Sequence, residues 1–264
     1  MKYFVLLFFL TFINFTLLGR VYSVNPISQD TVFLINKIPN FNFNLSYIDK
    51  FGDYISIDGI EKNKIMSETP YIEIKTPFFN YWLRKGNYYE LYGNYHDGFE
   101  PEMEISLKDR IQSDNEAMFF VHLYRENQNL SINFVQRQKE IKDNILRIKS
   151  KERYQQKIDY LNEQKANISP SFYDLCSKFF LIEYLDDLLY LFNERKEENI
   201  KQILLNYKDV IGWDDLIFSQ TYKQFLLRYV LMLDPKFSED YSGIKEYFNG
   251  KIRDYFLFNK IKTY

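Results

Sequence analysis

The sequence of 264 residues contains one cysteine, two histidines and no excess of charge of either sign. A single Cys excludes an intramolecular disulfide, a Cys-x-x-Cys redox pair and a cysteine-rich zinc site. Two His exclude most histidine-rich metal sites. The formal net charge of −2 provides no long-range attraction to nucleic acid or to an anionic membrane surface. These shortages remove several common function classes before any motif is considered.

What the sequence has is a composition suited to folding. Hydrophobic residues make up 46%, charged residues 27% and aromatic residues 19%, which is the balance of a globular chain. A chain of this length buries roughly 70% or more of its unfolded surface, so it needs no disulfide or metal for stability. With aromatic side chains this abundant, we expect most of them to fill the core rather than to form a binding platform.

Residues 1–23 have the pattern of a secretory signal peptide. Lys2 supplies the positive charge, and no charged residue occurs from Tyr3 to Leu18. Val21 and Ser23 then stand at the −3 and −1 positions of a cut before Val24. The alternative is a membrane anchor, but the uncharged run is shorter than the roughly 20 residues that span a bilayer. We therefore predict cleavage.

The predicted mature chain is an exported protein without a lipid anchor. No Cys follows the apolar run, so attachment of lipid to an N-terminal Cys is excluded, and no second run reaches membrane-spanning length. Loss of Lys2 and Arg20 changes the net charge from −2 to −4. We expect a periplasmic or otherwise extracytoplasmic location, no stable membrane span after cleavage, and no nucleic-acid partner.

Residues 24–109 predict a small domain of short strands. Phe41, Phe43, Leu45 and Tyr47 alternate with polar residues, which is typical of a half-buried strand. Glycine-containing turn signals separate several further candidates. These are Thr31–Ile35, Tyr54–Asp58, Tyr71–Lys75, Tyr81–Arg84, Tyr88–Tyr92 and Met103–Leu107. Strands of this length and spacing predict an antiparallel β-sandwich.

Residues 110–264 predict a helical domain, so the fold class expected is α+β. The apolar period lengthens after Lys108, and Ser169-Pro170 is a typical helix start. The helix from Phe172 to about Phe192 is apolar on nearly all sides and should lie centrally in a bundle. The other expected helices are a run through Phe119–Leu123, a polar helix or helix pair over Phe134–Asn167, Glu198–Val210, Thr221–Leu233 and one amphipathic helix from about Asp240.

No motif in the chain predicts catalysis, a cofactor or a metal. Cys176 lies among phenylalanines on one helical face, which favours an inert buried thiol. Gly93 and Gly98 have the spacing of a phosphate loop, but the lysine that would contact the phosphate is absent. His96, Asp97, Glu100, Glu102 and Glu104 form the densest group of potential ligands. Their spacing matches no metal-binding pattern, so a solvated acidic loop is the preferred interpretation. We predict no catalytic, cofactor-binding or metal-binding residue.

Charged residues in the helical half favour structural roles. Asp186-Asp187 and Asp214-Asp215 are adjacent in sequence, so the two members of each pair point in different directions on a helix and cannot share a proton. We expect helix caps or exposed charges, although one of Asp186 and Asp187 could bond within the bundle. The basic residues Arg147, Lys149, Lys151 and Arg153 are interspersed with other residues, which favours a solvated face.

Several phrases resemble the N-terminal, non-thioredoxin region of TlpA-like thiol-disulfide oxidoreductases of the bacterial envelope. The strongest is the strand–turn–strand pattern around Gly86, followed by a Ser-x-x-Phe helix start at Ser169 and the pair Glu183-Tyr184. The segments that carry the resemblance are Thr69–Ile74, Tyr81–Leu91, Ile168–Phe172, Phe218–Leu226 and Phe248–Asp254.

The resemblance implies an exported module that precedes a thioredoxin domain, where a Cys-x-x-Cys pair exchanges disulfides. This chain ends where that domain would begin, and Cys176 matches no family catalytic position. The expected function is therefore non-catalytic: positioning a thioredoxin-like domain or binding a substrate or envelope protein for it.

Two alternatives remain open at this point. The chain could be a free-standing exported protein that binds another protein or a ligand, with Phe256, Phe258 and Ile261 either packed internally or forming a partner interface. It could also be a hydrolase or lectin, with a site near Tyr88, Tyr89, Tyr92 and Tyr95.

Overall fold

The computed structural model describes residues 30–37, 45–48, 54–57, 62–75, 80–92, 102–107, 110–237 and 240–262. The signal peptide predicted at 1–23 lies outside these residues, as do Phe41, Phe43 and the loop around His96. Nine strands precede the helices in this part of the chain. They are β1 (Thr31–Asn36), β2 (Leu45–Ile48), β3 (Tyr54–Ile57), β4 (Lys62–Met66), β5 (Tyr71–Lys75), β6 (Asn80–Arg84), β7 (Tyr88–Tyr92), β8 (Glu102–Leu107) and β9 (Arg110–Ser113).

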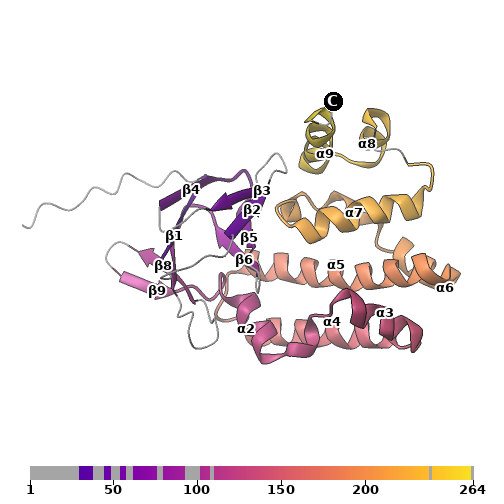
Figure 1. Cartoon of the computed structure of the whole chain (residues 1–264), viewed down its shortest axis with the longest axis horizontal. Coiled ribbons are helices and arrows are strands. Elements are labelled where there is room, and N and C mark those ends of the chain that lie inside the picture. Colours follow the sequence, from indigo (N-terminus) through magenta and orange to yellow (C-terminus); the bar gives the residue numbers. More distant parts are fainter. Residues whose placement is uncertain are drawn as a thin grey trace, which may run out of the picture.

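The helices follow in the order α2 to α9, with short 3-10 turns between some of them. Their bounds are α2 (Phe119–Glu126), η1 (Gln128–Leu130), α3 (Phe134–Lys142), α4 (Leu146–Glu163), α5 (Pro170–Arg195), α6 (Glu198–Leu205), η2 (Lys208–Gly212), η3 (Asp214–Leu216), α7 (Gln220–Leu233), α8 (Tyr241–Tyr247) and α9 (Gly250–Lys262). A β region followed by a helical bundle confirms the predicted α+β class (Figure 1).

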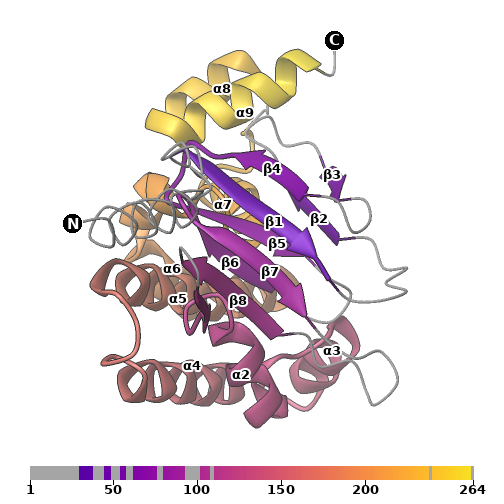
Figure 2. The same cartoon turned by 90° about the vertical axis from the view of Figure 1, so that its left-hand side faces the viewer.

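The strands form two sheets that share one apolar layer. The five-stranded sheet has the order β4-β1-β7-β8-β9 and the four-stranded sheet has the order β3-β2-β5-β6 (Figure 2). Val32 and Leu91 of the first sheet and Ile74 of the second are fully buried in the same cluster. All pairings are antiparallel except that of β1 with β7, which is parallel. The strand pattern did not predict this parallel pair, nor the strands β4 and β9.

The four-stranded sheet also has a buried outer face, because the helices cover it. In β6, Tyr81 and Leu83 point into the layer between the sheets, whereas Trp82 belongs to the cluster of the helical bundle. The Trp82 ring meets Phe120 at 4.6 Å and both Phe179 and Phe218 at 4.9 Å, all edge to face. Edge-to-face contacts between aromatic rings stabilise the folded state beyond the contribution from burying the rings. Trp82 therefore joins the β region to the bundle.

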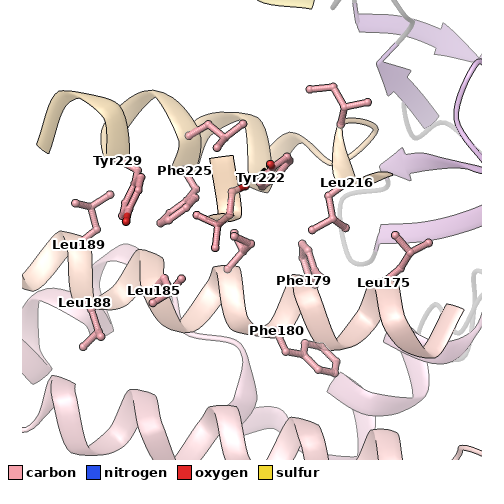
Figure 3. Close-up of a cluster of buried hydrophobic side chains, with 14 of the residues drawn as sticks. Leu175, Phe179, Phe180, Leu185, Leu188, Leu189, Leu216, Tyr222, Phe225 and Tyr229 are labelled. Carbon is pink, nitrogen blue, oxygen red and sulfur yellow. Dashed lines mark hydrogen bonds between the residues drawn. The ribbon is translucent and has the colours of Figure 1, made fainter. Parts of the chain in front are cut away.

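Helix α5 is the centre of the bundle, as its apolar surface predicted. It lies between α4 and α7 (Figure 1), and the side chains of its α7-facing side, such as Leu185 and Leu189, meet Phe225 and Tyr229 of α7 (Figure 3). The Ser169 hydroxyl accepts a hydrogen bond from Phe172 N, and Pro170 occupies the first turn. Ser169-Pro170 is therefore the helix start that the sequence indicated.

The C-terminal region corrects one expectation. The predicted single helix from Asp240 is two helices, α8 and α9, because Phe248 is extended and Gly250 has a φ of 55°. A side chain at Gly250 would place its Cβ 2.1 Å from the Asp214 carboxylate, so the position needs glycine for space as well as for conformation. Asp214 in turn accepts hydrogen bonds from Lys251 N and Ile252 N at the start of α9.

The apolar residues near the end of the chain have different environments. Phe256 is buried and stacks on Phe248 at 4.7 Å, whereas Ile261 is 68% exposed. Phe258 is half-buried and lines a cleft described below. Helix α9 thus packs on the bundle through part of its apolar surface.

Candidate functional site

A cleft of about 230 Å³ lies where the β region meets α7 and α9. The strand side is formed by Tyr47 of β2, Ile72 of β5 and the turn between β4 and β5. The bundle side is formed by Ile217, Phe218 and Lys223, and α9 closes the third side with Lys251, Tyr255 and Phe258. In Figure 2, α9 lies beyond the β4 edge of the sheet, which places it over this junction. We call this hollow the junction cleft.

The turn from β4 to β5 gives the cleft a rigid edge. The Ser67 hydroxyl donates to Thr69 O at 2.9 Å and accepts from Thr69 N at 3.2 Å, and the Thr69 hydroxyl donates to Tyr71 O at 2.6 Å. Ser67 N is bonded to Asp30 O. Ser and Thr hydroxyl groups can form hydrogen bonds with backbone N–H and C=O groups of their own turn, in place of bonds to a neighbouring strand. The polar atoms of this edge are therefore held in place by the chain itself.

Lys223 is the unusual residue of the cleft, since it is a lysine only 4% exposed. Its ammonium lies 4.2 Å from the centre of the Tyr255 ring, a cation–π contact. A second hollow of about 240 Å³, between α7, α8 and α9, is lined by the same two residues. The Lys223–Tyr255 pair therefore lines both hollows.

Glu73 of β5 interacts electrostatically with Lys223 and caps the N-terminus of α7. Its carboxylate accepts hydrogen bonds from Gln220 N at 3.0 Å and from the Asn80 amide at 3.3 Å. Burial raises the pKa of the Glu73 carboxyl above its usual range, while the bond from Gln220 N and the charges of Lys75 and Lys223 oppose this rise. The α7 N-terminus, which has no cap from its own Ser219 side chain, is thus capped from the sheet.

Lys251 supplies a second ammonium at the cleft. It is exposed at the start of α9 and donates to Glu68 O at 3.1 Å. The neighbouring Asp254 is bonded by the Arg253 guanidinium at 2.9 and 3.1 Å. The cleft therefore presents two lysines from two different helices, together with apolar surface from Ile217 and Phe258.

A second group of charges lies inside the bundle and is built differently. We call it the arginine–carboxylate cluster: Arg137, Arg153, Arg228, Glu140, Asp186 and Asp187. Arg153 bonds both oxygens of Glu140 at 3.0 Å and Asp187 at 3.1 Å. Arg228 bonds Asp186 at 2.6 Å. Three positive and three negative groups cancel within the cluster, and each ion pair joins one helix to another.

Four residues of the cluster line a hollow of about 110 Å³: Arg137, Arg153, Asp186 and Asp187. Lys157 and Glu183, which pair at 3.0 Å, also line it. Burial raises the pKa of Asp186, and Arg228 and Arg137 oppose the rise. A buried group in which each charge has a partner serves to hold helices in register more than to bind a ligand. We therefore place the candidate site in the junction cleft.

This cluster overturns two expectations from the sequence. Asp186 and Asp187 were expected as caps or exposed charges, with one of them able to bond within the bundle, but both are 6% exposed and paired with arginines. Arg153 was expected on a solvated face, but it is 8% exposed. The residues of α4 that face the bundle are Leu146, Ser150, Arg153, Lys157 and Leu161. Ile148 of the same helix is 61% exposed.

A signal for the cluster was present in the sequence. Basic residues at 153 and 157 are four apart, and Glu183, Asp186 and Asp187 interrupt the most apolar helix of the chain. Residues four apart share a helix face, so complementary charges on α4 and α5 could have been matched. No such signal marks the junction cleft, because its lysines are widely separated and belong to ordinary amphipathic segments.

The remaining candidates do not converge on one site. Cys176 is fully buried, and burial raises the pKa of its thiol well above the usual range, as expected. Asp214 caps α9, and Asp215 pairs with Lys178 at 2.6 Å. No group of three or more His, Cys, Asp or Glu side chains suited to a metal ion occurs among the described residues.

The tyrosines of β7 are not gathered on one face. Tyr89 is fully buried between the sheets, and its hydroxyl accepts from Arg84 N at 2.8 Å. Tyr88 lies on the opposite face against Phe33, with ring centres 6.4 Å apart. Tyr95 lies outside the described residues. The alternation of β7 thus separates the residues on which a sugar-binding site was considered.

Comparison of the chain with protein-family models, with curated proteins and with solved structures gives no match. Within the part of the chain that the structure describes, no helix has the length and apolar character needed to cross a membrane.

Proposed function

We propose that this chain is a non-catalytic binding module whose ligand occupies the junction cleft. The observation that carries the proposal is the nearly buried Lys223 beside a cavity lined by apolar side chains and by a second lysine, Lys251. A concave site with apolar sides and few polar groups is the usual form of a ligand site. Its position between the β region and the bundle is also where such sites commonly occur.

The test is a screen of small neutral, cationic and anionic amphiphiles, with the melting temperature of the purified chain as the readout. Any ligand of the cleft binds the folded state and raises that temperature by mass action. Asp254→Trp places a large ring at the exposed mouth of the cleft, and Glu246→Trp on α8 is the matched exposed control. We expect hits whose effect is lost in Asp254→Trp and kept in Glu246→Trp. The proposal would be contradicted if no compound raised the melting temperature, or if the rise were the same in Asp254→Trp as in the parent chain.

We propose, further, that the module is exported and serves a thioredoxin-like partner, as the resemblance to TlpA-like proteins implies. Support comes from the segment Asn80–Tyr92, which forms β6, a turn with Gly86 at a φ of 84°, and β7. This is the strand–turn–strand that the resemblance predicts. The partner would then deliver or receive what the cleft binds.

Two measurements test this narrower proposal. Residues 1–23 fused to a reporter that is active only outside the cytoplasm should give activity, and a Lys2→Glu fusion should give less. The chain alone should leave insulin disulfides intact, because its one thiol, Cys176, is buried. An inactive reporter, or reduction of insulin by the chain alone, would count against the proposal.

A further inference from the structure

A further hollow lies at the end of the helical bundle away from the β region, and it shares no residue with the junction cleft. It has a volume of about 630 Å³ and is bounded by the end of α3, the first half of α4 and the end of α5 (Figure 1). We call it the α3–α4 groove. We infer that this groove binds an amphipathic helix of a partner protein, whose apolar face contacts Ile148 and whose acidic residues meet Arg147 and Lys151. The surface is independent of the ligand site proposed above.

The floor of the α3–α4 groove is apolar. Ile141 of α3, Leu146 of α4 and Leu191 of α5 are buried and line it. Ile148 also lines the groove, but it is 61% exposed. Burying a large exposed apolar side chain against a partner is favourable. The groove therefore has an apolar contact surface that extends from its buried floor to an exposed isoleucine.

The shape of the groove fits a helix. Its α4 side runs from Arg147 to Gln155 and includes Ile148, Lys151 and Glu152. At a rise of 1.5 Å per residue this stretch is about 12 Å long, which is a little over two helical turns. Positions 148, 151, 152 and 155 are three or four residues apart, so they form one continuous stripe on α4. A groove of this form accepts the apolar face of a second helix.

The turn between α3 and α4 is fixed to the end of α5. Asn144 has a φ of 61°, and Ile145 N donates to Glu140 O at 2.9 Å across the turn. The Arg195 guanidinium of α5 donates to Ile141 O and to the side-chain oxygen of Asn144. These bonds position one end of the groove before a partner arrives, so less conformational entropy is lost on binding.

Two basic side chains of α4 lie at the groove and form no ion pair within the part of the chain that the structure describes. Arg147 and Lys151 are exposed and four residues apart, so they share one face of α4. The charge of Arg147 opposes the rise in the pKa of Tyr184 that burial causes. A protonated phenol does not neutralise a guanidinium. Both cations can therefore pair with an acidic partner.

The acidic side chains that line the groove are already paired with basic residues. The pairs are Glu140 with Arg153 at 3.0 Å, Glu152 with Lys149 at 2.8 Å and Glu197 with Arg195 at 3.8 Å. These three pairs add no net charge, so Arg147 and Lys151 give the groove an excess of two positive charges. Complementary charges favour a partner and like charges reject it. An acidic amphipathic helix therefore fits this surface, and a basic one does not.

The experiment measures the binding of three labelled peptides to the full chain by fluorescence anisotropy at low salt. Each peptide has about 15 residues, the length at which an isolated helix begins to form, with leucines at positions i, i+3, i+4 and i+7. The positions that flank the leucines are glutamate in the first peptide, glutamine in the second and lysine in the third. We expect the glutamate peptide to bind about fivefold more tightly than the glutamine peptide and at least about tenfold more tightly than the lysine peptide. Raising the salt concentration should weaken the binding of the glutamate peptide only.

Variants of exposed residues then locate the peptide, and none of them removes a buried side chain. Arg147→Gln combined with Lys151→Gln should reduce the advantage of the glutamate peptide over the glutamine peptide to less than about twofold. Lys208→Gln, at an exposed lysine of η2 outside the groove, is the charge control and should leave that advantage unchanged. Ile148→Gln should weaken both peptides about fivefold or more, because it removes apolar contact area. Ile261→Gln, at a similarly exposed isoleucine of α9, should weaken neither.

The outcomes separate this inference from the ligand site in the junction cleft. If the glutamine or the lysine peptide binds as tightly as the glutamate peptide, or if no peptide binds, the inference is wrong and the proposed function is unaffected. If light scattering shows a dimer of the chain that Ile148→Gln abolishes, a second copy occupies the groove and the inference is overturned. If Asp254→Trp blocks the peptide and Ile148→Gln does not, the peptide binds in the junction cleft, and only the inference about the α3–α4 groove fails.

Discussion

The junction cleft and the arginine–carboxylate cluster both bury basic side chains, but they use them in opposite ways. In the cluster, Arg137, Arg153 and Arg228 each meet a carboxylate within 2.6–3.1 Å at their closest contacts. In the cleft, Lys223 rests on an aromatic ring and faces a cavity. The cluster joins helices α3, α4, α5 and α7 through ion pairs, whereas the cleft combines its lysines with apolar side chains that a ligand can contact. Substitutions in the two regions should therefore differ in their effects on stability.

Arg153→Met should cause the largest loss of stability. The substitution leaves the buried Glu140 without its ion-pair partner and leaves Asp187 with Arg137 alone. Breaking a buried pair in this way costs about 3–5 kcal/mol. Urea denaturation measures the free energy of unfolding. Lys149→Met is the control, because its ion pair with Glu152 is about half exposed and should contribute less than about 1 kcal/mol. A loss below about 1 kcal/mol for Arg153→Met would show that the cluster is not a structural element.

Glu73→Gln should change how stability depends on pH. Burial raises the folded pKa of Glu73 above its ordinary value of about 4.5, so the folded state holds this proton more tightly than the unfolded state does. Its contribution to stability is therefore present below about pH 4.5 and is lost as pH rises through the folded pKa. The variant does not lose stability in this way, because glutamine carries no proton that titrates in this range. Urea midpoints from pH 4 to pH 8 should move in favour of the variant as pH rises, and a constant difference would contradict the account.

Lys223→Met should lower the free energy of unfolding by about 0.5–2 kcal/mol, less than Arg153→Met does, because it removes the cation–π contact with Tyr255. The same urea experiment measures it. The same change at Arg153 removes ion pairs to Glu140 and Asp187, whereas at Lys223 it removes the contact with the Tyr255 ring. A loss above about 2 kcal/mol would make Lys223 a structural residue like Arg153.

Thiol reactivity compares the access of a reagent to the interior of the helical bundle with its access to the junction cleft. It requires no change in the stability of the chain. Cys176 is fully buried, and burial raises the pKa of its thiol. Iodoacetamide should modify it at least about 100-fold more slowly in the native chain than in urea, since only the thiolate reacts. Asp254→Cys in a Cys176→Ser background should react at close to the rate of an exposed thiol. Similar rates for the two positions would mean that the bundle opens as readily as the cleft.

The elements of this fold could be predicted where their signals are local. The alternation of β6 and β7 and the Ser169-Pro170 start of α5 each depend on neighbouring residues, and each was found. The predicted helix after Asp240 failed at Gly250 for a different reason. That glycine meets Asp214 of η3, a residue 36 positions earlier, so the break depends on a distant contact.

The capping of the helices shows the same limit. Glu73 bonds the start of α7 across 147 residues, and Glu116 bonds Ser169 N at the start of α5 across 53 residues. A local pattern contains no trace of such pairs. The junction cleft is formed by the same long-range packing, from β2, the β4–β5 turn, α7 and α9. Its residues could be found only once the β region and the bundle were placed together.

The measurement that tests the central claim most directly is a titration of the full chain with an alkyl amphiphile that binds in the screen, observed through the methyl signals of the isoleucines by NMR. The account predicts shifts of the Ile72 and Ile217 methyl signals, which line the junction cleft, and none for the exposed Ile148 of α4. It also predicts contacts between the alkyl chain and the Phe258 ring. Shifts confined to Ile148 or to other surface positions, with Ile72 and Ile217 unchanged, would contradict it.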